Sequence, residues 1–153
     1  MTSQSPLPDP STPFGECVHR RLHDDRLIWL ITVGSDGTPQ PNPVWFLWDG
    51  ESVLVYNVAS AHRLRHVRER PRVSLHVDGV GEGVVVIAGR AWIDAGHPPA
   101  DEHPPFLTKY GGLMGKGPQA WARRFPVAIR IRPLSVRGHV AGGRLRSGVV
   151  PLS

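Results

Sequence analysis

The chain has 153 residues, enough for one domain, and 40% of them are hydrophobic, so it can bury a sizeable core. Its single cysteine excludes an intramolecular disulfide, and no apolar run is long enough for a signal peptide or a membrane span, so we expect a cytoplasmic protein with no membrane partner. The net charge is +5, but a bias towards arginine can reflect codon usage alone, so the charge by itself does not indicate nucleic acid.

The first part of the chain alternates turn signals with apolar runs. Residues 1–13 are rich in Pro, Ser and Thr and predict a flexible lead-in, and residues 14–25 can form a short helix. The run "RLIWLITV" is apolar on both faces, which predicts a strand buried on both sides. With 17 Gly and 16 Pro, the chain should contain many turns and short strands.

The next strand, "PQPNPVWFLW", combines prolines with an apolar run. Pro39, Pro41 and Pro43 cannot donate to a sheet ladder on one side, which is typical of an edge strand. Residues 44–48 are apolar on both faces, and we expect that one small barrel cannot bury both. The strand therefore needs a cover, which is either a second subunit or a flat ligand laid along its backbone. A short turn then joins it to "SVLVYNV" in a hairpin.

The second half of the chain predicts further strands and short helices. "PRVSLHV" has one apolar face, and "GVVVIAGRAWI" is a long apolar strand. Short proline-interrupted helices are expected within 98–112 and 117–125, and 126–136 closes the sheet as a half-exposed strand. Strands without a βαβ rhythm predict a mainly β (α+β) domain built as an antiparallel barrel.

The segment "SAHRLRHVRERPRVSL" gathers five arginines around one acid. Residues 61–69 are predicted to form a short helix with Ser60 as its N-cap. His62 and Arg63 then lie in the first turn, where the helix dipole disfavours cations. A bound phosphate would compensate, gripped by Arg63 in a bidentate fork, with the Ser60 hydroxyl and Arg65 approaching from the same end.

A simpler interpretation of this segment remains open. Charge runs on a surface helix are usually just solvated, and we prefer this for Arg68 and Arg70. The histidines have no metal-binding frame with a carboxylate or cysteine, so no metal site is expected. No catalytic side chain can be identified, because neither a nucleophile with a paired base nor a carboxylate dyad is recognisable. Chemistry, if any, should reside in a cofactor.

Several strings carry a resemblance to a known family. "GTPQPNPVWFLWDGESVLVYNVASAHRLRHVRERPRVSLHVDG", "VVVIAGRAWI", "YGGLMG" and "IRPLSVRGH" together resemble the pyridoxamine 5'-phosphate oxidase-like split-barrel superfamily, and within it the B-type flavin/deazaflavin oxidoreductases. The resemblance divides the chain into a lead-in (1–13), a split-barrel domain (14–139) and a loose tail (140–153). It departs at two positions, since many relatives have lysine at Arg63 and asparagine at His66.

The resemblance implies a six-stranded split β-barrel that forms a homodimer with two sites along the interface. It also implies which residues bind the cofactor. The strand backbone that would face the ring belongs to Asn42, Pro43, Val44 and Trp45. The residues that would hold the phosphate are Asn57, Ser60, His62, Arg63 and Arg65.

The function expected from the resemblance is hydride transfer from reduced coenzyme F420 to a small organic acceptor. Two alternatives remain open: an FMN- or FAD-binding flavoprotein, and a non-catalytic protein that binds a flavin or haem. Nucleic acid is not expected as a partner, because no aromatic residues are interleaved with the arginines of residues 60–72 for stacking on bases.

Overall fold

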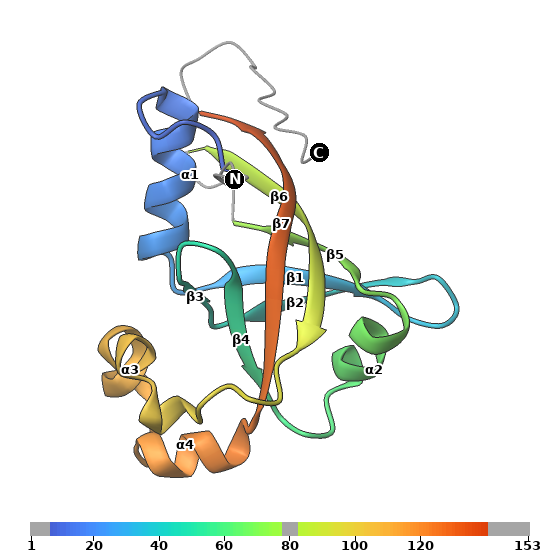
Figure 1. Ribbon diagram of the computed structural model, residues 1–153, viewed down its shortest axis with the longest axis vertical. Coiled ribbons are helices and arrows are strands. Elements are labelled where there is room, and N and C mark those ends of the chain that lie inside the picture. The colour runs from blue at the N-terminus through green and yellow to red at the C-terminus, as the bar shows by residue number, and fades with distance from the viewer. Residues whose placement is uncertain (1–6, 78–82, 141–153) are drawn as a thin grey trace.

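The computed structural model describes residues 7–77 and 83–140. All its strands pair antiparallel in one sheet, in the order β2-β1-β5-β6-β7-β4-β3, and the sheet curls into an open half-barrel (Figure 1). In chain order the elements are α1 (Pro13–Asp24), β1 (Ile28–Val33), β2 (Pro39–Val44), β3 (Leu47–Trp48), β4 (Val53–Asn57), α2 (His62–Glu69), β5 (Arg72–His76), β6 (Val84–Ile93), η1 (Ala100–Glu102), α3 (Pro104–Tyr110), η2 (Gly111–Leu113), α4 (Pro118–Arg124) and β7 (Val127–His139).

The mainly β split-barrel class is confirmed, but the sheet has seven strands and not six. The additional strand is β3, which has two residues and pairs with β4. Pairing with β1 stops at Val44, and the chain then crosses to the opposite edge of the sheet, where Leu47 faces Leu54. The sequence shows one uninterrupted apolar run here, because no proline or glycine marks the crossing.

The main core fills the inside of the curl. The strand β5 shows how the sequence determines this: Val73 and Leu75 alternate with polar residues and are buried, as the period of two predicted. Two helices complete this core with their apolar stripes, α1 through Val18 and Leu22, and α2 through Leu64. The buried members on the other strands are Ile28, Leu30, Val44, Val53, Val55, Val85, Ile87, Ala91, Ile129, Ile131 and Val136, and Phe46 joins them from the link between β2 and β3.

A second buried cluster lies on the other side of residues 44–48. Trp45 and Leu47 pack there against residues of η1, α3 and α4, while Phe46 enters the main core. Both faces of this run are therefore covered within one chain, and our expectation that it needs a cover from outside was wrong. The reason is that the two short helices, adjacent in Figure 1, supply the missing layer. Within this layer, Trp121 of α4 stacks on Phe125, the C-cap residue of the same helix.

The outward face of the sheet is only partly covered. On β1, Ile28 and Leu30 are fully buried, whereas Trp29 is 37% exposed and stacks on His76. The predicted burial of this strand on both sides was therefore wrong. Trp92 of β6 is also 41% exposed. Among the described residues, no helix is long and apolar enough to cross a membrane.

Candidate functional site

A buried amide holds an arginine at the start of α2. Asn57, the last residue of β4, is fully buried, and its Nδ2 donates to the carbonyl oxygens of Val55 (2.9 Å) and Val127 (3.1 Å). Its Oδ1 accepts from Arg63 Nε at 2.5 Å. Every polar atom of this amide is thus engaged within the protein. Asn57 therefore orients Arg63, and of this pair only the guanidinium has donors left for a ligand.

Arg63 itself is half-buried and has no ion-pair partner among the described residues. Burial lowers the pKa of Arg63, although a guanidinium stays charged at neutral pH. Because Nε is engaged by Asn57, the two Nη groups remain available as a fork, the geometry that suits a carboxylate or phosphate. A half-buried cation without a counter-charge is unfavourable, and a bound anion would remove that penalty.

The helix α2 starts without a side-chain cap. The predicted N-cap, Ser60, was wrong: Ala61 is the N-cap and makes no side-chain hydrogen bond. The Ala61 N–H donates to the Val58 oxygen at 3.1 Å, and this turn leaves Ser60 exposed, one residue before the cap. Since the alanine side chain has no polar atom, the first N–H groups of α2 are free of a capping side chain. They can bind an anion beside Arg63.

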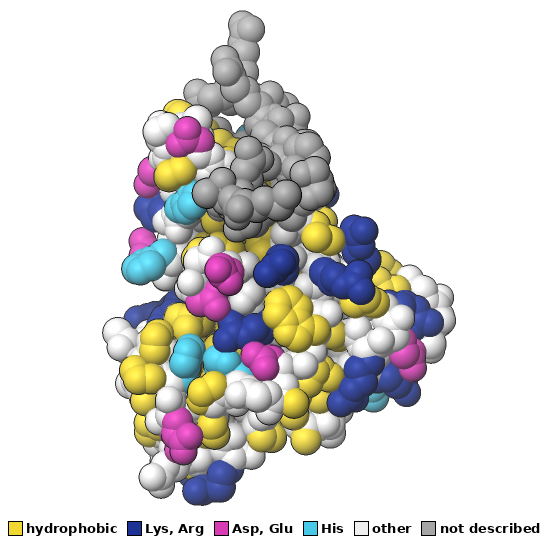
Figure 2. Space-filling model, viewed as in Figure 1, with side chains coloured by type: hydrophobic (Ala, Val, Ile, Leu, Met, Phe, Trp, Pro, Cys, Tyr) yellow, Lys and Arg dark blue, Asp and Glu magenta, His cyan; other side chains and the backbone are white. Residues whose placement is uncertain are grey.

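The other two basic residues of the predicted site lie elsewhere on α2. His62 and Arg65 are both exposed, three residues apart on the solvent side of the helix, whereas Arg63 faces inward. Figure 2 shows Lys and Arg side chains gathered on the side of the molecule that carries α2. Arg63 is thus the group in direct contact with the Asn57 cradle, and Arg65 adds positive potential around it.

A buried histidine docks α2 on the β1–β2 hairpin. His66 is almost fully buried, and its Nδ1 lies 2.9 Å from the Thr32 hydroxyl. Burial, together with nearby cations, lowers the pKa of His66. A Cβ built on Gly34 would lie 3.2 Å from Gln40 Nε2 and 3.5 Å from His66 Nε2, so the hairpin residues pack closely against the helix. This role was not predicted, because it depends on contacts 34 residues apart.

The free edge of β2 carries carbonyl groups only. The Gly34 N–H donates to the Thr38 oxygen, so the hydrogen-bonded pairs of this hairpin are Gln40 with Thr32 and Asn42 with Leu30. Pro39, Pro41 and Pro43 occupy the intervening positions, and their backbone groups point away from β1. Each is exposed, and each presents a carbonyl oxygen but no N–H.

Residues 44–46, at and just after the end of β2, form a polar corner. The Val44 side chain is buried in the main core, and the Trp45 ring stacks between Tyr110 (4.6 Å) and Trp121 (5.5 Å), so only their backbones remain for a ligand. The Phe46 carbonyl accepts from Lys109 Nζ at 3.0 Å, and its N–H donates to the Tyr110 hydroxyl at 2.9 Å.

Desolvation at this corner perturbs both titratable groups. It lowers the pKa of Lys109 to about 8 and raises the pKa of Tyr110 to about 12. The ammonium also lies 3.9 Å from the centre of the Phe46 ring, a cation–π contact. The sequence offered one signal that we did not use, namely a lysine in a chain whose other basic residues are nearly all arginine.

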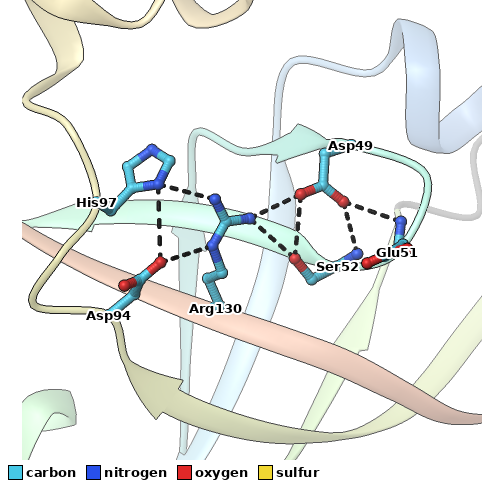
Figure 3. A network of polar contacts seen from close by, with 6 residues as sticks. All are labelled: Asp49, Glu51, Ser52, Asp94, His97 and Arg130. Atoms are coloured by element: carbon cyan, nitrogen blue, oxygen red, sulfur yellow. Dashed lines mark hydrogen bonds and ion pairs between the residues drawn. The ribbon is translucent and has the colours of Figure 1, made fainter.

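Arg130 of β7 is the centre of a polar network away from the start of α2 (Figure 3). Its guanidinium donates to Asp94 (2.9 Å), Asp49 (2.7 Å) and Ser52 (3.0 Å), and Nη2 lies 2.8 Å from His97 Nδ1. Since the arginine must donate, His97 carries its proton on Nε2. This network joins the β3–β4 turn to the segment after β6, and we assign it a structural role. Among the described residues, no cluster of three or more metal-ligating side chains occurs.

The predicted site residues thus form two groups. Asn57 and Arg63 are in direct contact, with His62, Arg65 and Ser60 around the same helix start. The residues 42–45 form the other group at the sheet edge. Among the described residues no hydrogen bond joins the groups, but α2 packs against the base of the β1–β2 hairpin through His66.

Comparisons with known proteins agree on the fold. A family model described as pyridoxamine 5'-phosphate oxidase matches residues 15–139. An F420 reductase is similar in structure, with 26% identity and a TM-score of 0.59 over 76% of this chain and 94% of that one. A conserved hypothetical protein from Mycobacterium tuberculosis is also similar, with 20% identity and a TM-score of 0.66 over 92% of this chain and 90% of that one. General stress protein 26 from Bacillus anthracis str. Sterne has 16% identity and a TM-score of 0.62 over 90% of this chain and 97% of that one. No curated protein matches the sequence.

Proposed function

Since the chain belongs to the pyridoxamine 5'-phosphate oxidase family, we propose that it is an oxidoreductase in which reduced coenzyme F420 passes a hydride to a small organic acceptor. The observation that carries the proposal is the unpaired Arg63 fork, oriented by Asn57 beside an uncapped helix start. Phosphate is the common feature of F420, FMN and FAD, and this arrangement suits a phosphate.

The residues present fit such a cofactor. Arg63 would bind the phosphate, and Asn57 would keep the guanidinium in place. The backbone of residues 42–45, where the Val44 and Trp45 side chains turn into the two cores, would leave a flat surface for the ring. When bound, the reduced deazaflavin supplies the hydride. The protein contributes orientation of ring and acceptor and exclusion of water, and it needs no side-chain acid or base.

The preference for F420 rests on the F420 reductase among the similar structures. An FMN- or FAD-dependent flavoprotein is the nearest alternative, because the phosphate site serves these cofactors equally well. A protein that binds a flavin or haem without turnover would use the same family fold.

We also propose that the protein acts as a homodimer. The support comes from the outward face of the sheet, where Trp29 and Trp92 remain more than a third exposed. Tryptophan is among the residues that contribute most to protein interfaces. A second copy packed on this face would bury both rings.

Parallel binding titrations with F420, FMN, FAD and haem test the proposed function. We expect F420 to bind most tightly, and the purified protein from a host without F420 to be colourless. Reduced F420 should then be oxidised in the presence of electron-deficient alkenes as probe acceptors, followed by its absorbance. Tight binding of haem, with no binding of F420, FMN or FAD, would contradict the proposal.

A further inference from the structure

The carbonyl-only edge of β2 has a chemical preference of its own. An ordinary edge strand offers alternating N–H donors and C=O acceptors. Here the three prolines, at alternate positions and all directed outwards, remove every outward backbone donor from Pro39 to Pro43. Carbonyl oxygens two residues apart recur about every 6.8 Å along an extended strand. From the backbone between Pro39 and Pro43 a ligand on this edge therefore meets acceptors only, and its own edge must supply donors or C–H groups to them.

The two candidate rings differ at this point. An oxidised flavin carries bare acceptor nitrogens, including N5 in the middle of the ring, which require a donor from the protein. A deazaflavin has a C–H group in place of N5, and it needs no such donor. Placing an acceptor nitrogen against a carbonyl leaves both groups unsatisfied, which is unfavourable once water is excluded.

We propose that Pro41 and Pro43 are specificity-determining residues, which select a deazaflavin over an oxidised flavin by withholding the backbone N–H that the flavin N5 requires. This inference rests on the proposed function, because it takes the ring to lie along residues 42–45. It extends that function by assigning the choice of cofactor to the strand backbone. The Arg63 site recognises only the phosphate that the cofactors share.

Three single substitutions test the inference: Pro43→Ala, Pro41→Ala and Pro39→Ala. Each restores one outward N–H without removing a hydrogen bond to β1, because all three prolines lie at non-hydrogen-bonded pairs. Pro39→Ala is the matched control, since this residue lies next to the hairpin loop, four positions from Pro43. Thermal melting checks that each variant is folded. If Pro43→Ala does not fold, Pro41→Ala takes its place as the test variant.

The probes are oxidised FMN and F420, titrated in parallel. In Pro43→Ala or Pro41→Ala the affinity for FMN should rise by about three- to tenfold, the effect of one hydrogen bond, while that for F420 stays unchanged. Pro39→Ala should leave both affinities unchanged. Wild-type protein should also bind reduced FMN, which carries an N5–H donor, more tightly than oxidised FMN.

The outcomes separate the two proposals. Two results would overturn the selection by prolines and leave the proposed function standing. The first is an FMN-to-F420 affinity ratio that does not change in folded Pro43→Ala and Pro41→Ala. The second is a change of this ratio that is equally large in Pro39→Ala. If the wild-type protein binds neither FMN nor F420, no ring lies on this edge, and both proposals are refuted.

Discussion

Replacing Arg63 tests the phosphate site most directly, because the structure separates its two contributions. Arg63→Ala removes a charge-assisted contact of about 1.5–3 kcal/mol to the phosphate, so the Kd for F420 or FMN should rise by roughly ten- to more than a hundredfold. It also leaves the buried Asn57 Oδ1 without its partner. An unsatisfied buried acceptor costs about 1–3 kcal/mol, which lowers the Tm of a chain of this size by roughly 2–10 °C.

Arg63→Gln separates charge from packing. The Gln Nε2 occupies the position of the arginine Nε and can still donate to Asn57, so the Tm should stay close to that of the wild type while the affinity falls as in Arg63→Ala. Arg70→Ala is the matched control, since Arg70 is at the other end of α2 and pairs with Glu69 at 3.0 Å. Titration calorimetry and thermal melting give both quantities. Retained affinity in Arg63→Gln, or equal losses in Arg63→Ala and Arg70→Ala, would refute the phosphate site.

Three further predictions use other parts of the molecule. Sedimentation at micromolar concentration should give a dimer, and the double substitution Trp29→Ser and Trp92→Ser should shift it to the monomer; a wild-type monomer would refute the proposed interface. The pKa of His66 is lowered in the fold, so its contribution to stability is complete above pH about 6.5 and is lost as the pH falls through the folded pKa. Urea melts should therefore show a free energy of unfolding that depends less on pH in His66→Gln than in the wild type. Since the pKa of Lys109 is about 8, trace acetylation monitored by mass spectrometry should show its rate levelling off above pH about 9, while the rate of a lysine in an unstructured reference peptide still rises. Parallel pH profiles for Lys109 and the reference peptide would contradict this.

Local patterns predicted the elements whose signals are local. The alternation in β5 and β7 placed the right residues inward, and the prolines of β2 were sufficient to indicate an edge strand. The family strings gave the barrel. These features succeed because a period of two, or a missing N–H, is a property of the strand itself.

Contacts between distant segments were not predictable in the same way. Nothing near Trp45 in the sequence indicates that Tyr110 and Trp121 will cover it, so the covering layer was sought outside the chain. The same holds for Asn57, because nothing in the sequence around it indicates its bonds to Arg63 and Val127. The prediction of Ser60 as the N-cap of α2 was wrong because the preceding turn shifts the helix start by one residue.

The position of β7 in the sheet has a consequence for folding kinetics. This strand, formed late along the chain, inserts between β6 and β4, so the β3–β4 hairpin has no other neighbour in the sheet. Its pairing with β4 joins residues as far apart as Val53 and Ile131, and Arg130 reaches back 81 residues to Asp49. Such non-local pairing slows folding. During synthesis the buried residues of β4 have only the two-residue β3 as a strand partner until β7 has emerged, and the nascent chain is most prone to aggregation in that interval.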